Sequence, residues 1–389
     1  MTRLEADWLA REAVRQVMTL FARAGEEAYF VGGCIRNTLL GVPVTDLDIA
    51  TPVRPERTLA LAAEAGLKAV PTGIDHGTVT VIAEGEPFEI TTFRRDVETD
   101  GRRAVVAYAD RLEEDARRRD FTMNALYADG TGRIHDPLGG LADLEARRVR
   151  FIDDANTRIR EDYLRILRFF RFHAWYGDDA QGLDPEGLAA CARNVEGIGT
   201  LSKERIGAEM LKLLSAPAPE LALGAMDRSG VLRAVLPGAE TKIFFVLAAL
   251  EPEPEPIRRL ASLGEFDVAA LLRLRKSLIR RYDYLRRAMA GTENLCEIAY
   301  REGADLARSV ALLRAALFGQ PLAPDLEARL ERAEGEIFPV SAKDLTPKFT
   351  GPALGERLRR LEKAWIDSGF SLDRAALLQR ADEDGDDET

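Results

Sequence analysis

Residues 32–50, GGCIRNTLLGVPVTDLDIA, decide the fold of the amino-terminal part of the chain. The two glycines end a short apolar segment, AYFVGG, which predicts a strand that turns into a helix over RNTLLG. VTDLDIAT then predicts a second strand, and HGTVTVIAEG and EPFEITTF predict two more, joined by a turn that contains glycine. This alternation of strands and helices indicates a small α/β unit within about the first 110 residues.

After residue 110 the pattern changes to leucine, alanine and arginine at helical spacing, which indicates a helical body. We therefore expect an α+β fold, in which a small mixed-sheet head is followed by helices only. The expected domains are a head over 1–150, a helical neck over 151–220, and a helical body and tail over 221–389 with an acidic, disordered end from about residue 381. The arginine-rich segment 94–110 is expected to be a mobile loop, and the EPEPEP run from residue 251 an exposed connection.

Composition excludes several classes of protein. The 389 residues contain no stretch of about 18 uncharged apolar residues, so we expect no transmembrane helix and no membrane partner. The charged amino terminus argues against a secretory signal. Three separated cysteines and three isolated histidines exclude a disulfide framework, a structural zinc site and a histidine-rich metal phosphohydrolase. A cytoplasmic location is expected.

The net charge of −11 argues against a nonspecific nucleic-acid coat. The charge is unevenly distributed, however, because residues 271–287 contain seven basic residues and one acid. This run fits an RNA backbone, and it equally fits the charged outer face of a helix.

Two aspartates in the first stretch are the strongest chemical signal. Asp46 and Asp48 stand two residues apart on the predicted strand, so their carboxylates should project from one face. Such a pair of like charges makes sense where divalent cations bind between them, and Glu89 on a later strand could join them. The alternative is a surface strand with alternating acids.

The turn before these acids is suited to phosphate binding. Gly32 and Gly33 end a strand and open a helix, so backbone amides can face phosphate groups, and Arg36 adds a cation one turn later. The alternative is an ordinary Gly-Gly turn.

Five motifs in order resemble the class II tRNA nucleotidyltransferase and bacterial poly(A) polymerase family. They are GGCIRNTLLGVPVTDLDIA, RRDFTMNALYAD, HDPLGGLADL, REDYLRILRFFRF and SKERIGAEMLKLL, and they cover roughly residues 28–215. The stretch from Phe338 to Phe370 also resembles the tail of that family. The resemblance implies a nucleotidyltransferase head followed by a helical neck, body and tail.

The resemblance also implies roles for single residues. Asp46 and Asp48 would be Mg²⁺ ligands, Glu89 a supporting third acid, and Gly33 and Arg36 would hold the triphosphate. One departure is visible, because the family's first motif usually has Arg-Asp where this chain has Arg36 and Asn37. The metal-binding pair is intact, but one neighbouring charge is missing.

The segment 117–129, RRRDFTMNALYAD, offers further ligand groups. Arg118 and Arg119 can meet phosphate, and Asp120 can accept a hydrogen bond from a ribose 2′-hydroxyl, which selects ribonucleotides. The alternative is that Asp120 caps a helix amino terminus.

Residues 160–172, REDYLRILRFFRF, are read as one helix on which Asp162, Arg165, Arg168 and, less closely, Arg171 follow at spacings of three. Without context such an Asp-Arg pair is usually a solvated ion pair. The resemblance makes Asp162 and Arg165 readers of the incoming base. A carboxylate that accepts from an exocyclic amine and a guanidinium that donates to the adjacent ring nitrogen admit CTP and ATP and reject UTP and GTP. Arg168 and Arg171 would then lie toward the triphosphate or the outer face of the helix.

The predicted function is template-independent, Mg²⁺-dependent addition of CMP and AMP to the 3′ end of tRNA. A poly(A) polymerase would share the head residues, and an enzyme that adds only A or only CC is a further alternative. A catalytically silent RNA-binding protein on the same scaffold is the alternative from another class, but it has no need of clustered acids.

Overall fold

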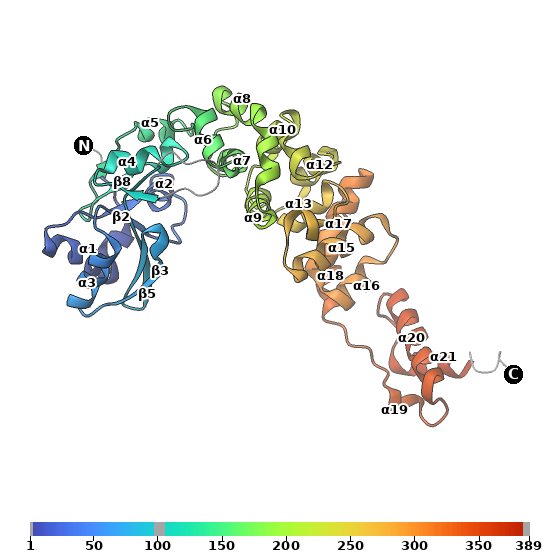
Figure 1. Ribbon diagram of the computed structural model, residues 1–389. Coiled ribbons are helices and arrows are strands. Elements are labelled where there is room, and N and C mark those ends of the chain that lie inside the picture. The colour runs from blue at the N-terminus through green and yellow to red at the C-terminus, as the bar shows by residue number, and fades with distance from the viewer. Residues whose placement is uncertain (1–2, 97–105, 384–389) are drawn as a thin grey trace. The chain divides into compact units, whose positions relative to one another are not determined.

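The computed structural model describes residues 3–96 and 106–383, which belong to two compact units, Met1–Val235 and Leu236–Thr389. In Figure 1 the first unit runs from blue to yellow-green and contains the sheet, whereas the second consists of helices. This composition confirms the α+β expectation. The predicted boundary at residue 150 falls inside the first unit, so a separate neck remains a proposal.

A seven-stranded mixed sheet organises the first unit, with strand order β3-β4-β5-β2-β1-β8-β9. Strands β2 and β5 pair in parallel and the other neighbours are antiparallel. The strands are β1 Tyr29–Val31, β2 Asp48–Thr51, β3 Lys68–Gly73, β4 Thr78–Ala83, β5 Glu86–Thr92, β8 Tyr127–Ala128 and β9 Ile134–His135. A separate ribbon pairs β6 Arg94–Asp96 with β7 Val106–Tyr108. The middle of the predicted loop 94–110 lies outside the described residues.

Alternating burial explains why these segments form strands. In β4, Val79, Val81 and Ala83 are buried while the residues between them are partly exposed. Helix α1 Glu12–Ala24 packs against β4, and helix α3 Pro55–Glu64 packs against β3 and β4. Figure 1 shows both helices beside the sheet. Gly25 ends α1 in the left-handed conformation, which glycine adopts at little cost.

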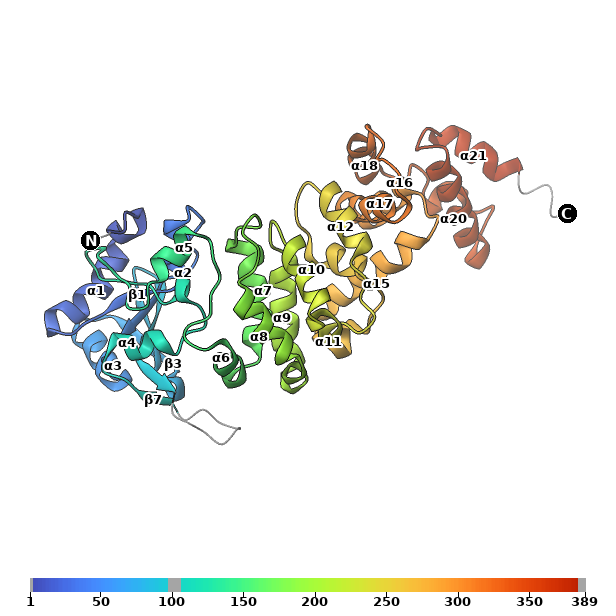
Figure 2. The same ribbon diagram turned by 90° about the horizontal axis from the view of Figure 1, so that it is seen from above.

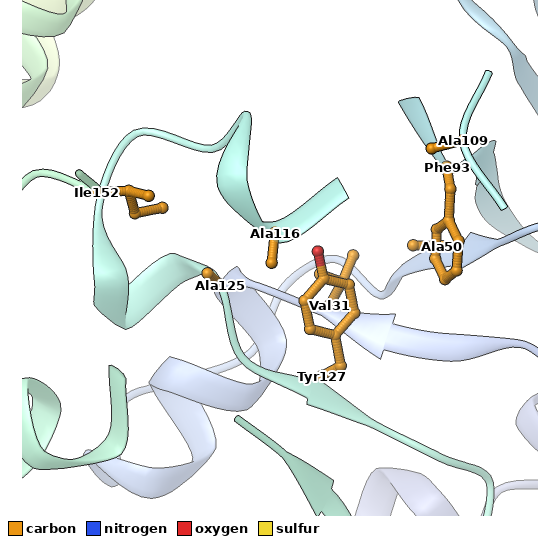
Figure 3. Close-up of a cluster of buried hydrophobic side chains, with 8 residues drawn as sticks. All are labelled: Val31, Ala50, Phe93, Ala109, Ala116, Ala125, Tyr127 and Ile152. Carbon is orange, nitrogen blue, oxygen red and sulfur yellow. The ribbon is translucent and has the colours of Figure 1, made fainter. Parts of the chain in front are cut away.

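A second layer of core lies where the sheet meets the following helices. Tyr127 of β8 extends toward Ala116 of α4 Leu112–Arg117, and Phe93 packs beside Ala50 (Figure 3). The cluster is formed by Val31, Ala50, Phe93, Ala109, Ala116, Ala125, Tyr127 and Ile152. It fixes the end of β1, and therefore the Gly-Gly turn that follows that strand.

The remaining helices of the first unit follow the sheet. They are α2 Gly33–Leu39, α5 Gly140–Glu145, α6 Ala155–Glu161, α7 Leu164–Tyr176, α8 Pro185–Arg193, α9 Lys203–Leu214, α10 Glu220–Arg228 and α11 Val231–Val235. Helices α7 and α9 lie side by side (Figure 2). Short 3₁₀ turns lie at Asp7–Ala10, Ile74–His76, Thr122–Asn124 and Val195–Thr200.

The second unit is built from α12 Lys242–Leu250, α13 Pro256–Ser262, α14 Val268–Leu272, α15 Lys276–Ala290, α16 Leu295–Glu302, α17 Ala304–Phe318, α18 Leu326–Glu334, α19 Ala342–Leu345, α20 Gly351–Asp367 and α21 Arg374–Glu383. None of the helices in the described ranges is long and apolar enough to cross a membrane.

The EPEPEP run connects α12 to α13, and its residues Pro252, Glu253 and Pro254 are exposed as expected. Glu251 departs from this expectation, because its side chain is 1% exposed and forms ion pairs with Arg258 and Arg259 of the buried helix α13. Helix α21 continues to Glu383, and the acidic, disordered end expected from about residue 381 stays a prediction. Residues 384–389 lie outside the described residues.

Candidate active site

Three carboxylates line one hollow of about 630 Å³ in the first unit, as the sequence predicts. Asp48 opens β2 and lies opposite Glu89 of β5 in the parallel register, so both project from the same face of the sheet. Asp46 lines the same hollow but precedes the strand, and its carboxylate accepts a hydrogen bond from Thr45 Oγ1 at 2.9 Å. The expectation that Asp46 lies on the strand is therefore wrong, although the two aspartates do come together.

The acids act on one another electrostatically. The pKa of the Asp48 carboxyl is raised, first by its partial removal from water and then by the negative charge of Glu89, while Arg119 opposes the shift. Asp46 raises it further. A divalent cation would relieve this repulsion, and carboxylate oxygens are the ligands that Mg²⁺ prefers, so the donor set fits. Across residues 3–96 and 106–383 no three acidic, histidine or cysteine side chains form a ready-made metal group.

The Gly-Gly turn brings two arginines together. Gly32 adopts φ 71° and ψ −110°, and a Cβ there would lie 3.3 Å from the Asn124 carbonyl oxygen and 3.6 Å from Arg119 Nη1. A Cβ on Gly33 would lie 3.7 Å from Arg36 Nη2. Glycine is thus required at residue 32, and the turn has a guanidinium on each side.

Arg36 is buried in the middle of α2. Its guanidinium donates to Asn124 Oδ1 at 2.5 Å, to Asn37 Oδ1 at 2.8 Å and to Tyr176 Oη at 2.9 Å. Asn37 therefore has a defined place, because it accepts from Arg36 and donates to the Pro43 carbonyl.

Arg119 is held by Asp115, a residue that the sequence did not single out. Asp115 is fully buried, and its carboxylate accepts from Arg118, from Arg119 Nη2 at 2.9 Å and from Tyr127 Oη at 2.8 Å. Burial alone would raise the pKa of Asp115, but Arg119 and Arg118 hold it well below its usual range. Asp115 stands four residues before Arg119, a spacing that permits an ion pair, but Glu113 and Glu114 beside it are acids as well, so the sequence does not single it out.

Asp120 links the segment 117–129 to α7 through an ion pair with Arg168. Its carboxylate accepts from Phe121 N–H, from Asn124 Nδ2 at 3.0 Å and from Arg168 Nε at 2.6 Å. Burial would raise its pKa, and Arg168 and Asn124 lower it below the usual value. A ribose hydroxyl would therefore compete with Arg168 for this carboxylate, and the predicted ribose contact remains a prediction.

The predicted ridge of Asp162, Arg165, Arg168 and Arg171 is only partly present. Helix α6 ends at Glu161 and α7 begins at Leu164, so Asp162 lies in an extended link (φ −153°, ψ 104°). Its carboxylate accepts from Arg205 of α9 at 2.7 Å, whereas Arg165 pairs with Glu161. The expected Asp162–Arg165 ridge on a single helix is wrong, because the helix breaks between them.

The other two arginines of this segment are paired as well. Arg168 binds Asp120, and Arg171 binds Glu209 of α9 at 2.6 Å. Both guanidiniums also lie over the ring of Phe172. The structure thus places Arg168 near the head, while Arg171 ties α7 to α9.

Comparison with known proteins agrees with this architecture. Residues 28–150 match the Poly A polymerase head domain, and residues 182–243 match the probable RNA and SrmB-binding site of polymerase A. The chain is 33% identical to mitochondrial CCA tRNA nucleotidyltransferase 1 of Mus musculus over 95% of this chain and 90% of that protein. It is 34% identical to the CCA-adding enzyme of Geobacillus kaustophilus over 89% of this chain and 90% of that protein.

A solved structure shows the same fold along the whole chain. The crystal structure of the Bacillus stearothermophilus CCA-adding enzyme in complex with CTP matches with a TM-score of 0.78 and 29% identity, over 97% of this chain and 100% of that one. Enzymes of this family use a divalent metal ion. This chain belongs to the family of the CCA-adding enzymes, the CCA tRNA nucleotidyltransferases.

Proposed function

We propose that the protein adds CMP and then AMP to the 3′ end of tRNA from CTP and ATP, without a template. The observation that carries this proposal is the hollow that Asp46, Asp48 and Glu89 share, in a chain that is related along its length to CCA-adding enzymes. The names of those relatives state the activity. The site supplies acids and cations of the kind that nucleotidyl transfer needs.

In the reaction, the 3′-hydroxyl of the tRNA attacks the α-phosphate of the nucleotide and pyrophosphate leaves. The divalent cation, which we propose to be Mg²⁺, would lower the pKa of the attacking hydroxyl and offset charge on the leaving group. Asp46 and Asp48 would hold it, and Glu89 would support Asp48. Arg36 and Arg119, on either side of the Gly32–Gly33 turn, would face the triphosphate.

We propose that Asp162 and Arg165 select the base of the incoming nucleotide. In the structure each is held by another partner, Asp162 by Arg205 and Arg165 by Glu161. To read a base, Asp162 would accept from the exocyclic amine of cytosine or adenine, and Arg165 would donate to the adjacent ring nitrogen. Both contacts would use polar atoms that the ion pairs keep oriented.

The finer assignments stay proposals. We propose a head over 1–150 and a neck over 151–220, with tRNA held by the helices after residue 220. The cytoplasmic location also stays a prediction; it is consistent with three free cysteines, of which Cys34 and Cys191 are buried.

The deciding experiment supplies the purified protein with tRNA that lacks its 3′ CCA, plus CTP, ATP or both. We expect two CMP with CTP alone and CCA with both nucleotides, read by the length and composition of the product. Asp46→Asn and Asp48→Asn should each lose about a hundredfold or more of the rate. Asp75→Asn, the same change at an exposed aspartate outside the hollow, is the matched control.

Each rival function gives a different product. An adenosine tail on any RNA would identify a poly(A) polymerase, and addition of only A or only CC would identify a specialist. Binding of tRNA with no incorporation by the wild-type protein would reduce the protein to an RNA-binding scaffold.

A further inference from the structure

Arg36 is a buried cation whose direct partners are all neutral. Its residue is 7% exposed, and within the described ranges its side chain donates only to Asn37, Asn124 and Tyr176. A guanidinium withdrawn from water without a carboxylate is costly, and burial lowers its pKa below the usual value. Such a group is stable where an anion completes its environment.

Tyr176, at the carboxyl-terminal end of α7, contacts the Arg36 guanidinium with both its ring and its hydroxyl. It is the last residue of α7, 140 positions from Arg36 in sequence, and its ring centroid lies 4.0 Å from the guanidinium carbon. Its hydroxyl also accepts from Arg36 Nη2 at 2.9 Å. The Phe172 ring, one helical turn earlier, lies 5.1 Å from the same carbon. Two aromatic rings therefore hold the cation through their faces without neutralising it.

The neighbouring carboxylates are already used. Arg36, Arg168 and Arg171 all lie over the Phe172 ring. The two acids in this cluster, Asp120 and Glu209, bind Arg168 and Arg171. The cluster therefore has three guanidiniums and two carboxylates, and the guanidinium without a carboxylate partner is that of Arg36.

We propose that Tyr176 and Asn37 are positioning residues, which hold Arg36 in a neutral cage beside the Gly32–Gly33 turn so that the triphosphate of the nucleotide becomes its counter-ion. This inference rests on the proposed function, and it adds to that function a residue of α7 and a role for Asn37 in this chain. Arg36 Nη2 would lie 3.7 Å from a Cβ at residue 33, where glycine contributes no side chain to cover the guanidinium. An aspartate at residue 37 would pair with Arg36 directly and weaken its attraction for the ligand.

The first test replaces the tyrosine. Tyr176→Leu should raise the KM for CTP and for ATP, and the inhibition constant of inorganic triphosphate, by about tenfold with kcat within about twofold, because the variant has neither the ring nor the hydroxyl. Tyr176→Phe keeps the ring and should raise the same constants by about threefold. Tyr284→Leu makes the same chemical change on α15 of the second unit, is the matched control and should change none of them.

The second test adds a charge instead of removing an aromatic ring. Asn37→Asp should raise the inhibition constant of inorganic triphosphate by about tenfold at low salt and by less at high salt, because the new carboxylate screens Arg36. Asn156→Asp makes the same chemical change on α6, away from Arg36, and should leave the constant unchanged.

The outcomes distinguish failure of the proposed function from failure of the inference about Arg36. If wild-type protein incorporates no nucleotide, the proposed function is wrong. If wild type is active and inorganic triphosphate inhibits Asn37→Asp and Tyr176→Phe as strongly as wild type, the cage does not serve the triphosphate and the inference is overturned. A fall in kcat at unchanged KM would likewise overturn it, since it would assign Tyr176 to folding or to the chemical step.

Discussion

At the scale of single residues, Asp115 organises the cations of the head. Its carboxylate is 1% exposed and binds Arg118, Arg119 and the Tyr127 hydroxyl, and Tyr127 itself belongs to the core cluster. Arg119 in turn lies beside Gly32 and acts on the pKa of Asp48. Asp115 therefore fixes, through contacts with the core, an arginine whose charge acts on the acidic hollow. The sequence shows Asp115 as one acid among several in a charged segment, and only burial distinguishes it.

Asp115→Asn should destabilise the protein by about 3–5 kcal/mol at pH 7, because it leaves Arg119 without its carboxylate partner. The folded pKa of Asp115 lies below the unfolded value, so its contribution to stability is present above that unfolded value and is lost as the pH falls. The difference in the free energy of unfolding between wild type and Asp115→Asn should therefore become smaller below about pH 4. Urea unfolding between pH 7 and 3 measures it. Asp110→Asn, at an exposed ion pair with Arg54, is the control, and equal stability of wild type and Asp115→Asn at pH 7 would contradict the prediction.

At the scale of elements, the pattern of residues predicts periodic segments well and junctions poorly. Strands β4 and β5 are predicted because their burial alternates, whereas β3 escapes prediction because most of its residues are exposed on both sides. The run 160–172 has helical periodicity throughout, yet the helix breaks at Asp162. There the Asp162 carboxylate accepts from the Leu164 N–H and Arg205 binds it from α9, a contact 43 residues away that no local pattern contains.

This break does not remove the role proposed for Asp162 and Arg165 but changes how it is tested. Asp162→Ala and Arg165→Ala should each lose about 1–3 kcal/mol of discrimination against UTP and GTP, since a base-edge contact is left wrong or unpaired. Competition among all four nucleotides measures the effect. Arg205→Ala removes the present partner of Asp162 but keeps the carboxylate, so its selectivity should remain. Equal loss of rate for every nucleotide in the first two variants would mean that these residues form structural ion pairs only.

At the scale of the whole molecule, the proposed function requires a chain with a net charge of −11 to bind a polyanion, tRNA. Composition presents the basic run 271–287 as one surface, but the structure divides it into two sets. Arg281 binds Asp305 and Arg286 donates to the Ala261 carbonyl, so both serve the packing of the second unit. Four exposed members of the run, Arg275, Lys276, Arg280 and Arg287, have no carboxylate partner among the residues that the structure describes. Composition could not separate the two sets, because the difference lies in contacts between helices.

Three of these residues, Arg275, Lys276 and Arg280, cluster at the start of α15 and should bind tRNA phosphates. Replacing all three with alanine should weaken tRNA binding and reduce the slope of log affinity against log salt by about one for each phosphate that the protein no longer neutralises. Filter binding or fluorescence anisotropy between low and physiological salt measures both quantities. The KM for CTP should be unchanged, because the nucleotide site lies in the other unit. Arg332→Ala, at an exposed arginine of α18, is the control for removal of a single positive charge. An unchanged salt slope in the triple variant would show that this face of α15 is only a solvated helix surface and that the tRNA backbone is held elsewhere.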